Sequence, residues 1–196
     1  MKRPGLRSTA NPDFRLTVSG PVLIVGGGPS APADLAKLAG IDFAAIISAN
    51  LHGFVAVDQG LIPRVDYVLL GDVRNSETRE FQEPIFRTYN KPLLGRHPCC
   101  DYSVEIPLPG VGEYRLNAGQ LAIVAGCHIG GSPVYPVGLD CWQHDDTYWH
   151  DTGADVVCMR QEHGVYYRIP AQLRTLKNVC KGYDVRPQSG PLLSIM

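Results

Sequence analysis

Short apolar runs alternate with segments of helix-forming residues along most of the chain. The apolar runs predict strands at Pro21–Val25, Asp42–Ser48, Val65–Leu70 and Pro133–Leu139, because continuous apolar runs of this length are typical of strands buried on both faces. Helices are predicted at Ala31–Leu38, Leu51–Gln59, Asn117–Ile129 and Pro170–Val179. This alternation predicts an α/β fold with a Rossmann-like, open and mostly parallel sheet flanked by helices.

Weaker patterns fill the rest of the chain. A short helix is predicted at Thr78–Arg87, and short strands at Lys91–Gly95 and Tyr183–Arg186. Residues 1–20 combine Pro, Gly and Asn with little periodicity and predict an irregular N-terminal arm. Residues 96–115, rich in Pro, Gly and Cys, predict a loop or a hairpin excursion. The length of 196 residues predicts one nucleotide-binding-like α/β domain over residues 1–196.

Net charge, apolar content and cysteine spacing limit the classes of protein that are compatible with the sequence. A net charge of −1 gives no indication of nucleic-acid binding. No apolar stretch approaches the roughly 20 residues needed to span a bilayer, and the polar start Met1–Arg15 lacks the apolar segment of a secretory signal. A cytoplasmic location is therefore expected. The six cysteines form no Cys-x-x-Cys pair, so thiols without disulfides are predicted rather than a zinc site.

A glycine turn follows the first predicted strand. Open parallel sheets bind ligands outside the carboxyl ends of their strands. Glycines let a backbone approach a ligand closely, and the start of the next helix offers N–H groups to a phosphate. The sequence matches neither the dinucleotide fingerprint nor the P-loop. The alternative is a tight turn without a ligand. The predicted nucleotide-binding residues here are Gly26, Gly27, Gly28, Pro29 and Ser30.

Polar residues also follow the next two predicted strands. Asn50 offers an amide that can read a base or a sugar edge; alternatively it is the N-cap of the next helix. Asp72 ends the third predicted strand. Its carboxylate suits a ribose hydroxyl or a Mg²⁺ ion on a phosphate. The alternative for Asp72 is a turn-forming role.

The segment Asp140–Asp151 holds the densest group of polar and aromatic residues, DCWQHDDTYWHD. Tyr148 and His150 are candidates for acid–base chemistry or for assistance to a leaving group. A metal site formed by histidines and carboxylates and a solvated loop are the alternatives.

Several of these motifs resemble one known family. The turn GGGPS resembles the GNGPS turn of the bacterial sialyltransferases of glycosyltransferase family 42, and Asn50 in SANLHG resembles that family's Cys-Asn element. Residues 116–151 resemble the family's stretch from a Thr-Ser-Gly helix start, through an Ile-Tyr-Leu-x-Gly-Ile-Asp strand, to a Tyr-containing loop. The resemblance covers about half of the chain and implies a related fold with a site for a CMP-sugar-like nucleotide.

The resemblance also implies roles for individual residues. Nucleotide contacts are implied for the glycine turn, for Asn50 and for the helix start, and Asp140 matches the Asp of the strand motif. Tyr148 matches a loop tyrosine that assists the departing phosphate, while Trp142 stands in place of the other loop tyrosine. The general-base histidine is His163 or His150. The helix start consists of Asn117, Ala118 and Gly119, with Ala118 and Gly27 standing where the family has Ser and Asn.

A second resemblance joins the glycine turn to the segment VDYVLLGD. These two motifs resemble the pterin and thiamine diphosphokinases, in which two strand-end aspartates hold Mg²⁺. Asp66 and Asp72 match these aspartates. Archaeal hydroxymethylpterin diphosphokinases and bacterial and phage relatives of the motility-accessory glycosyltransferases share these features.

The sequence therefore predicts a glycosyltransferase-like enzyme that binds a nucleotide or nucleotide-sugar, without a metal or other cofactor. One alternative is a Mg²⁺-dependent diphosphokinase that uses Asp72 with Asp66. Another is a catalytically inactive binding or structural relative. Edge strands and residues 96–115 are compatible with a homo-oligomer.

Overall fold

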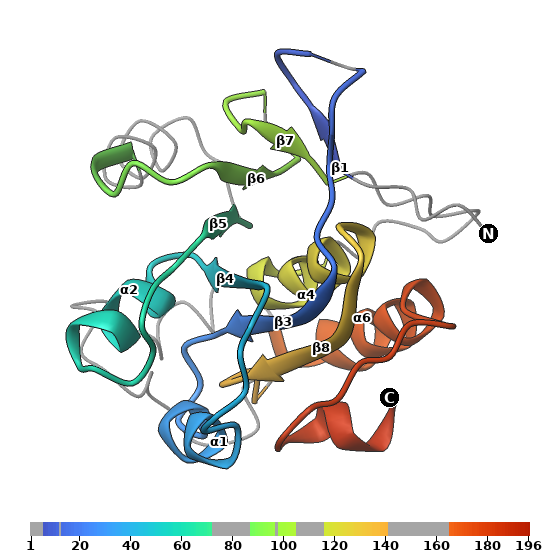
Figure 1. Ribbon diagram of the computed structural model, residues 1–196. Coiled ribbons are helices and arrows are strands. Elements are labelled where there is room, and N and C mark those ends of the chain that lie inside the picture. The colour runs from blue at the N-terminus through green and yellow to red at the C-terminus, as the bar shows by residue number, and fades with distance from the viewer. Residues whose placement is uncertain (1–5, 12, 72–86, 97, 105–115, 141–164) are drawn as a thin grey trace.

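The computed structural model describes residues 6–11, 13–71, 87–96, 98–104, 116–140 and 165–196 (Figure 1). Eight strands form one sheet in the order β2-β1-β7-β6-β5-β4-β3-β8. Neighbouring strands are parallel from β7 through to β8, and antiparallel pairs are found where β1 meets β7 and β2. The predicted open and mostly parallel sheet is thus confirmed. The strands are β1 (Leu6–Ser8), β2 (Arg15–Leu16), β3 (Gly20–Val25), β4 (Ala45–Ala49), β5 (Tyr67–Leu70), β6 (Leu93–Gly95), β7 (Tyr102–Ser103) and β8 (Gly131–Val137).

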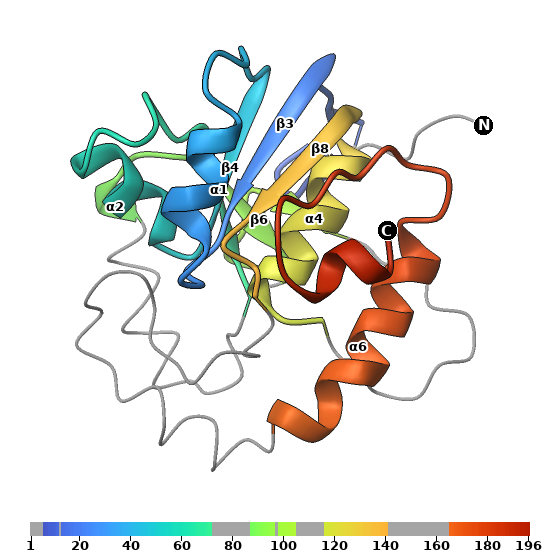
Figure 2. The same cartoon turned by 90° about the horizontal axis from the view of Figure 1, so that it is seen from below.

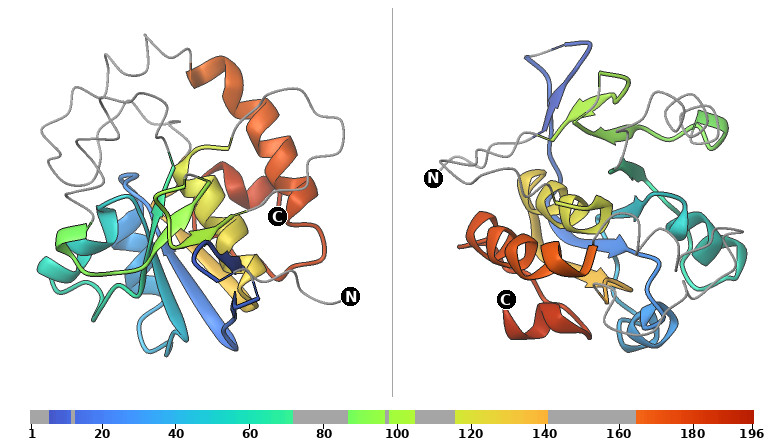
Figure 3. Two further views of the ribbon diagram at one scale, coloured as in Figure 1. Left: turned by 90° about the horizontal axis from the view of Figure 1, so that it is seen from above. Right: turned by 180° about the vertical axis from the view of Figure 1, so that it is seen from behind.

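Helices cover both faces of this sheet. Figure 2 shows α1 (Ala31–Lys37) and α2 (His52–Asp58) on one face and α4 (Ala118–His128) on the other. Helix α6 (Val165–Val179) lies beside α4, and a 3₁₀ turn, η1 (Pro191–Ser194), follows near the C-terminus (Figure 3). None of the helices in the described ranges is long and apolar enough to cross a membrane. The layered arrangement is that of an α/β protein.

The two faces of the central strands bury two separate groups of apolar side chains. Val22 and Ile24 of β3 pack in the core beneath α4. Leu23 and Val25, which point to the other face, pack in the core beneath α1 and α2. All four are fully buried, and full burial of one such side chain stabilises the fold by about 1.5–3 kcal/mol. This two-sided burial explains why β3 appears in the sequence as a continuous apolar run rather than as an alternating one.

The N-terminal arm is more regular than the sequence predicts. Strands β1 and β2 extend the sheet at one edge, and Leu6 and Leu16 of this pair are buried. Within residues 96–115, β7 is a further strand that pairs in parallel with β6. These strands are two or three residues long, too short for a period-two pattern to stand out from a turn-rich background.

The C-terminal part differs from the prediction at two points. Helix α6 begins at Val165, five residues before the predicted start at Pro170, which lies inside the helix. The predicted strand Tyr183–Arg186 is reduced to a single bridge between Val185 and Val134 of β8. Except for Arg87, the predicted helix Thr78–Arg87 lies outside the described residues.

The described cysteines form no disulfides with one another. Three of them, Cys100, Cys127 and Cys180, are buried, and Cys99 is half-buried. Their surroundings are those of small core residues. The remaining two, Cys141 and Cys158, lie outside the described residues.

A buried histidine gives the fold a pH dependence. His128, the last residue of α4, is 6% exposed, and its ring lies 6.0 Å from that of Tyr183, centroid to centroid. Burial lowers the pKa of His128 below the ordinary value of 6.5, because the imidazolium is poorly solvated there. The unfolded chain therefore takes up this proton at a higher pH than the folded chain does. The free energy of unfolding falls as the pH decreases through 6.5 and levels off below the folded-state pKa.

We expect the variant His128→Gln to flatten this part of the stability profile, because glutamine stays uncharged in both states. Urea unfolding of the two proteins between about pH 8 and about pH 5 measures the slope directly. An equal slope in the two proteins would show that another group produces the pH dependence.

Candidate functional site

Segments from distant parts of the chain meet at the carboxyl edge of the central strands. Residues 26–30 follow β3, Asn50 follows β4, and residues 138–140 follow β8. The start of α4 reaches the same edge beside Gly71, the residue after β5. A Cβ atom built on Gly71 would lie 2.2 Å from the Cβ atom of Ala118. Among the sequence candidates, the glycine turn, Asn50, Asn117–Gly119 and Asp140 are thus at one edge of the sheet.

The glycine turn packs directly against the residues that follow β8. The Gly28 N–H donates to the carbonyl oxygen of Gly138 over 2.7 Å. A Cβ atom on Gly26 would lie 2.3 Å from Cδ2 of Leu139, and one on Gly28 would lie 2.2 Å from Oδ2 of Asp140. The sequence predicts that these glycines admit a ligand, but the close neighbour in the structure is the chain itself. Leu139, which lies between the turn and α4, was not a sequence candidate, since an apolar residue at a strand end carries no chemical signal.

Asp140 supplies a negative charge at the start of α1. Its carboxylate is 4% exposed, and Oδ2 accepts a hydrogen bond of 3.0 Å from the Ser30 N–H. A helix start favours a negative group because its N–H groups lack acceptors within the helix. Here that group is the protein's own, so a phosphate at the same position would meet an existing carboxylate. The start of α1 is therefore a less suitable phosphate position than the sequence predicts.

The Ser30 hydroxyl is engaged rather than spare. Ser30 is the residue before α1, but its side chain does not cap the helix. Its Oγ donates to Oδ2 of Asp34 over 2.9 Å, and the Ser189 Oγ donates to the same oxygen over 2.5 Å. Lys37 Nζ donates to Oδ1 over 3.0 Å, and Asp34 is 1% exposed. We name these four residues the Asp34 network; it ties the glycine turn to the C-terminal segment.

Asn50 has a strained backbone and an unoccupied side chain. Its φ of 54° lies in the left-handed region, which Asn tolerates better than most residues. The Ser48 hydroxyl holds this turn: it donates to the Asn50 carbonyl oxygen over 2.6 Å and accepts the Gly53 N–H over 2.8 Å. The N-cap of α2 is Leu51, so the capping alternative for Asn50 is wrong. Among the described residues, the half-buried Asn50 amide has no hydrogen-bond partner.

Helix α4 begins with a capping box. Asn117 Oδ1 accepts the Gln120 N–H over 2.9 Å, and Gln120 Oε1 accepts the Asn117 N–H over 3.1 Å. The next two N–H groups, of Ala118 and Gly119, have no acceptor within the part of the chain that the structure describes. Eleven residues of aligned peptide dipoles follow, so this helix start is electrically positive. The capping role of Asn117 was not part of the sequence prediction.

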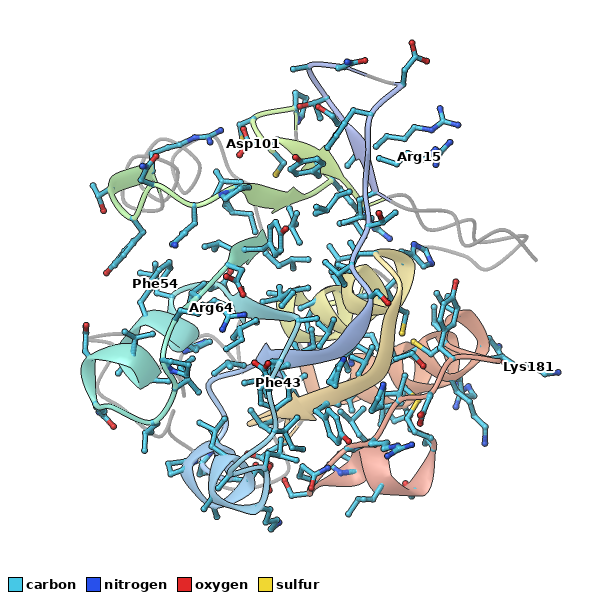
Figure 4. The ribbon with its side chains drawn as sticks, viewed as in Figure 1. Arg15, Phe43, Phe54, Arg64, Asp101 and Lys181 are labelled. Atoms are coloured by element: carbon cyan, nitrogen blue, oxygen red, sulfur yellow. The ribbon has the colours of Figure 1, made fainter. Side chains whose placement is uncertain are left out.

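Asp66 lies at the opposite edge of the sheet. It precedes β5, where its Oδ2 accepts the Ile46 N–H over 2.9 Å and its Oδ1 accepts Arg64 Nε over 2.9 Å. Arg64 also donates to the Phe43 carbonyl oxygen over 2.8 Å; both residues are labelled in Figure 4. The Asp66 carboxylate therefore links the beginning of β5 to the beginning of β4. The Asp66 carboxylate is thus occupied by contacts within the fold, and its predicted pairing with Asp72 around Mg²⁺ stays a prediction, because Asp72 lies outside the described residues.

Several predicted site residues lie outside the described residues. This group comprises Asp72, Trp142, Tyr148, His150 and His163. Their roles stay predictions from the sequence.

The sheet order and the polar carboxyl edge are those of the Rossmann-like α/β class. No protein-family model matches the sequence, and no curated protein is significantly similar to it. Solved structures with a similar chain course include the monofunctional alpha-2,3-sialyltransferase Cst-I from Campylobacter jejuni, at 10% identity and a TM-score of 0.48, with 94% of this chain and 82% of that chain covered.

Two further solved structures are also similar to this chain. The sialyltransferase CstII from Campylobacter jejuni, in complex with the substrate analogue cytidine-5'-monophosphate, matches at 11% identity and a TM-score of 0.45, over 92% of this chain and 84% of that chain. The MAf glycosyltransferase from Magnetospirillum magneticum AMB-1 matches at 17% identity and a TM-score of 0.48, over 95% of this chain and 36% of that chain.

Proposed function

We propose that this chain is a glycosyltransferase-like protein that binds a CMP-sugar-like donor at the carboxyl edge of its sheet, without a metal ion. The observation that supports it most is the set of unpartnered hydrogen-bonding groups from separate segments at that edge. These are the Asn50 amide and the Ala118 and Gly119 N–H groups, as far as the described residues extend. The sequence resemblance to family 42 sialyltransferases supplies the type of donor.

The unpartnered hydrogen-bonding groups at this edge suit different parts of a nucleotide. The start of α4 suits the phosphate, since its N–H groups and dipole favour negative charge. Asn50 offers both a donor and an acceptor to a base or sugar edge. Asp140 Oδ1, which has no partner among the described residues, is an acceptor for a ribose hydroxyl. This assignment moves the phosphate from the glycine turn, where Asp140 already lies, to α4.

The same arrangement suits transfer of the sugar. An acceptor hydroxyl attacks the anomeric carbon, the bond from that carbon to the phosphate oxygen breaks, and the nucleotide leaves with added negative charge. Donors fixed at the start of α4 stabilise that developing charge without reorganising. Tyr148 is the predicted donor to the departing phosphate, and His150 or His163 is the predicted base for the acceptor hydroxyl.

A thermal-shift series tests this proposal with CMP, CDP, UDP, GDP and ATP, each with Mg²⁺ and with EDTA. A nucleotide present at about one hundred times its Kd stabilises a fold by about 2.7 kcal/mol. We expect a shift with CMP that is equal in Mg²⁺ and in EDTA. A shift with ATP that EDTA removes would instead favour Mg²⁺-dependent pyrophosphoryl transfer. Absence of a shift with every nucleotide would contradict the proposal and favour a structural relative.

We expect Asn50→Gly to weaken CMP binding about 10- to 100-fold, which corresponds to the loss of one or two hydrogen bonds to the ligand. Glycine suits the left-handed backbone of Asn50, so the substitution removes the amide without straining the turn. Isothermal titration calorimetry measures the affinity. Asn90→Gly is a matched control, because Asn90 has a φ of 50° and is exposed outside the candidate site. Equal affinity of the two variants would remove Asn50 from the site.

A further inference from the structure

The capping box at α4 fixes the orientation of the Gln120 side chain. Because Gln120 Oε1 accepts the Asn117 N–H over 3.1 Å, the nitrogen and oxygen of this amide cannot be exchanged without placing two donors against each other. Nε2 is bonded to the same carbon as Oε1. The two N–H groups of the amide therefore lie beside the first residue of the helix, at its N-terminal end.

This amide nitrogen is buried and unpartnered. Gln120 is 2% exposed, and Nε2 has no hydrogen-bond partner among the described residues. Buried side-chain donors nearly always have a partner, because an unsatisfied one destabilises the fold. An unsatisfied donor at a candidate ligand site is accounted for when the ligand supplies the acceptor.

The neighbouring groups indicate what that acceptor is. The Ala118 and Gly119 N–H groups lie at the same helix end and likewise have no acceptor in the described ranges. Glutamate would complete the same capping box as glutamine does and would interact better with the positive helix start. Glutamine gains an advantage where an anion binds, since it offers N–H donors in place of a negative charge. A phosphate group, with several acceptor oxygens, fits this set of donors.

We propose that Gln120 Nε2 donates a hydrogen bond to a phosphate oxygen of the bound ligand, so that Gln120 is a ligand-binding residue as well as a helix cap. This inference deepens the proposed function and rests on it for the nucleotide that carries the phosphate. Gln120 was not among the sequence candidates, because a glutamine inside a predicted helix carries no local signal of ligand binding.

The test compares Gln120→Glu and Gln120→Met with wild type in titrations with CMP and with inorganic phosphate. Glutamate keeps the capping acceptor and adds a negative charge, whereas methionine removes the donor without adding charge. We expect CMP binding to weaken more than tenfold in both variants, and more in the glutamate variant. Gln59→Glu is the matched control, because Gln59 is exposed at the end of α2 and changes the net charge equally. A second measurement uses the wild-type protein alone. We expect the side-chain NH₂ signals of Gln120 in its ¹⁵N spectrum to shift when CMP or phosphate is added.

The outcomes separate this inference from the proposed function. Loss of CMP binding in the Gln120 variants, with Gln59→Glu unchanged, supports both. Normal CMP binding in the Gln120 variants, with unmoved NH₂ signals in wild type, overturns the inference and leaves the proposed function standing. If CMP does not bind to wild type but phosphate shifts the Gln120 NH₂ signals, the proposed function fails and the phosphate position holds. If neither ligand moves those signals, the inference is overturned.

Discussion

Gly71→Ala is expected to destabilise the protein by about 3 kcal/mol, at the upper end of overpacking effects, and to abolish nucleotide binding. The added Cβ would lie 2.2 Å from Cβ, 2.4 Å from Cα and 2.7 Å from the backbone nitrogen of Ala118. A side chain can turn aside, but two of these three atoms belong to the helix backbone. The start of α4 must therefore move away from β5, and with it the N–H groups assigned to the phosphate. Urea unfolding and CMP calorimetry measure the two effects.

Gly40→Ala is the matched control for this change. Gly40 lies in the left-handed region, with a φ of 87°, and a Cβ atom there meets nothing within 4 Å. Its expected destabilisation is about 1 kcal/mol from backbone strain alone, with CMP binding unchanged. If Gly71→Ala proves no less stable than Gly40→Ala, the close approach of α4 to the end of β5 is wrong.

Asp34→Ala is the second large change, with an expected loss of about 1.5–3 kcal/mol, the range for hydrogen bonds to a charged group. The carboxylate is 1% exposed and accepts bonds from Ser30, Ser189 and Lys37. Its removal leaves the Ser30 and Ser189 hydroxyls without this acceptor, whereas Lys37 Nζ still donates to the Gln188 carbonyl oxygen. The midpoint of urea unfolding measures the loss, and heteronuclear NMR shows whether the glycine turn and the C-terminal segment shift together.

Two further variants test why Asp34→Ala destabilises the fold. Asp34→Asn keeps the shape and one acceptor oxygen, so an intermediate loss is expected. Asp184→Ala removes an ion pair with Arg186 whose side chains are 42% and 56% exposed, and exposed pairs contribute about 0–1 kcal/mol. A loss for Asp34→Ala as small as that for Asp184→Ala would mean that the Asp34 network does not stabilise the fold.

The central sheet was predictable because its strands are buried on both faces. Residues such as Leu23 and Ile24, which pack against opposite layers of helices, both have to be apolar, so the run is continuous and its ends are marked by glycines and polar residues. The helices followed from their position between these runs. The short edge strands β1 and β2 were missed because each buries only a single leucine, which leaves no period to detect.

The edge at which the candidate residues lie was predictable, but not their contacts. The carboxyl ends of parallel strands lie at one edge in any such sheet, so Asn50 and Asp140 were expected to meet there, whereas the start of α4 was a candidate only through the family resemblance. The contact of the Asp140 carboxylate with Ser30 and the burial of Asp34 depend on how the loops pack against each other. The local sequence does not predict this packing. The glycines illustrate the difference: the sequence predicts that they admit a ligand, whereas Leu139 and Asp140 lie where Cβ atoms on Gly26 and Gly28 would be.

The hydrogen bond between Ser189 and Asp34 joins residues 155 positions apart. Contacts across so long a stretch close a large loop and lose much chain entropy before they contribute any stability. The parallel pairing of β3 with β4 and of β4 with β5 involves far shorter separations and can form earlier. The pairing of β3 with β8 is also long-range, since Leu23 pairs with Tyr135, so only the β3–β4–β5 part of the sheet is expected to form early. We therefore expect the three strands β3, β4 and β5 to pair before the Ser189–Asp34 contact fixes the turn at their carboxyl edge.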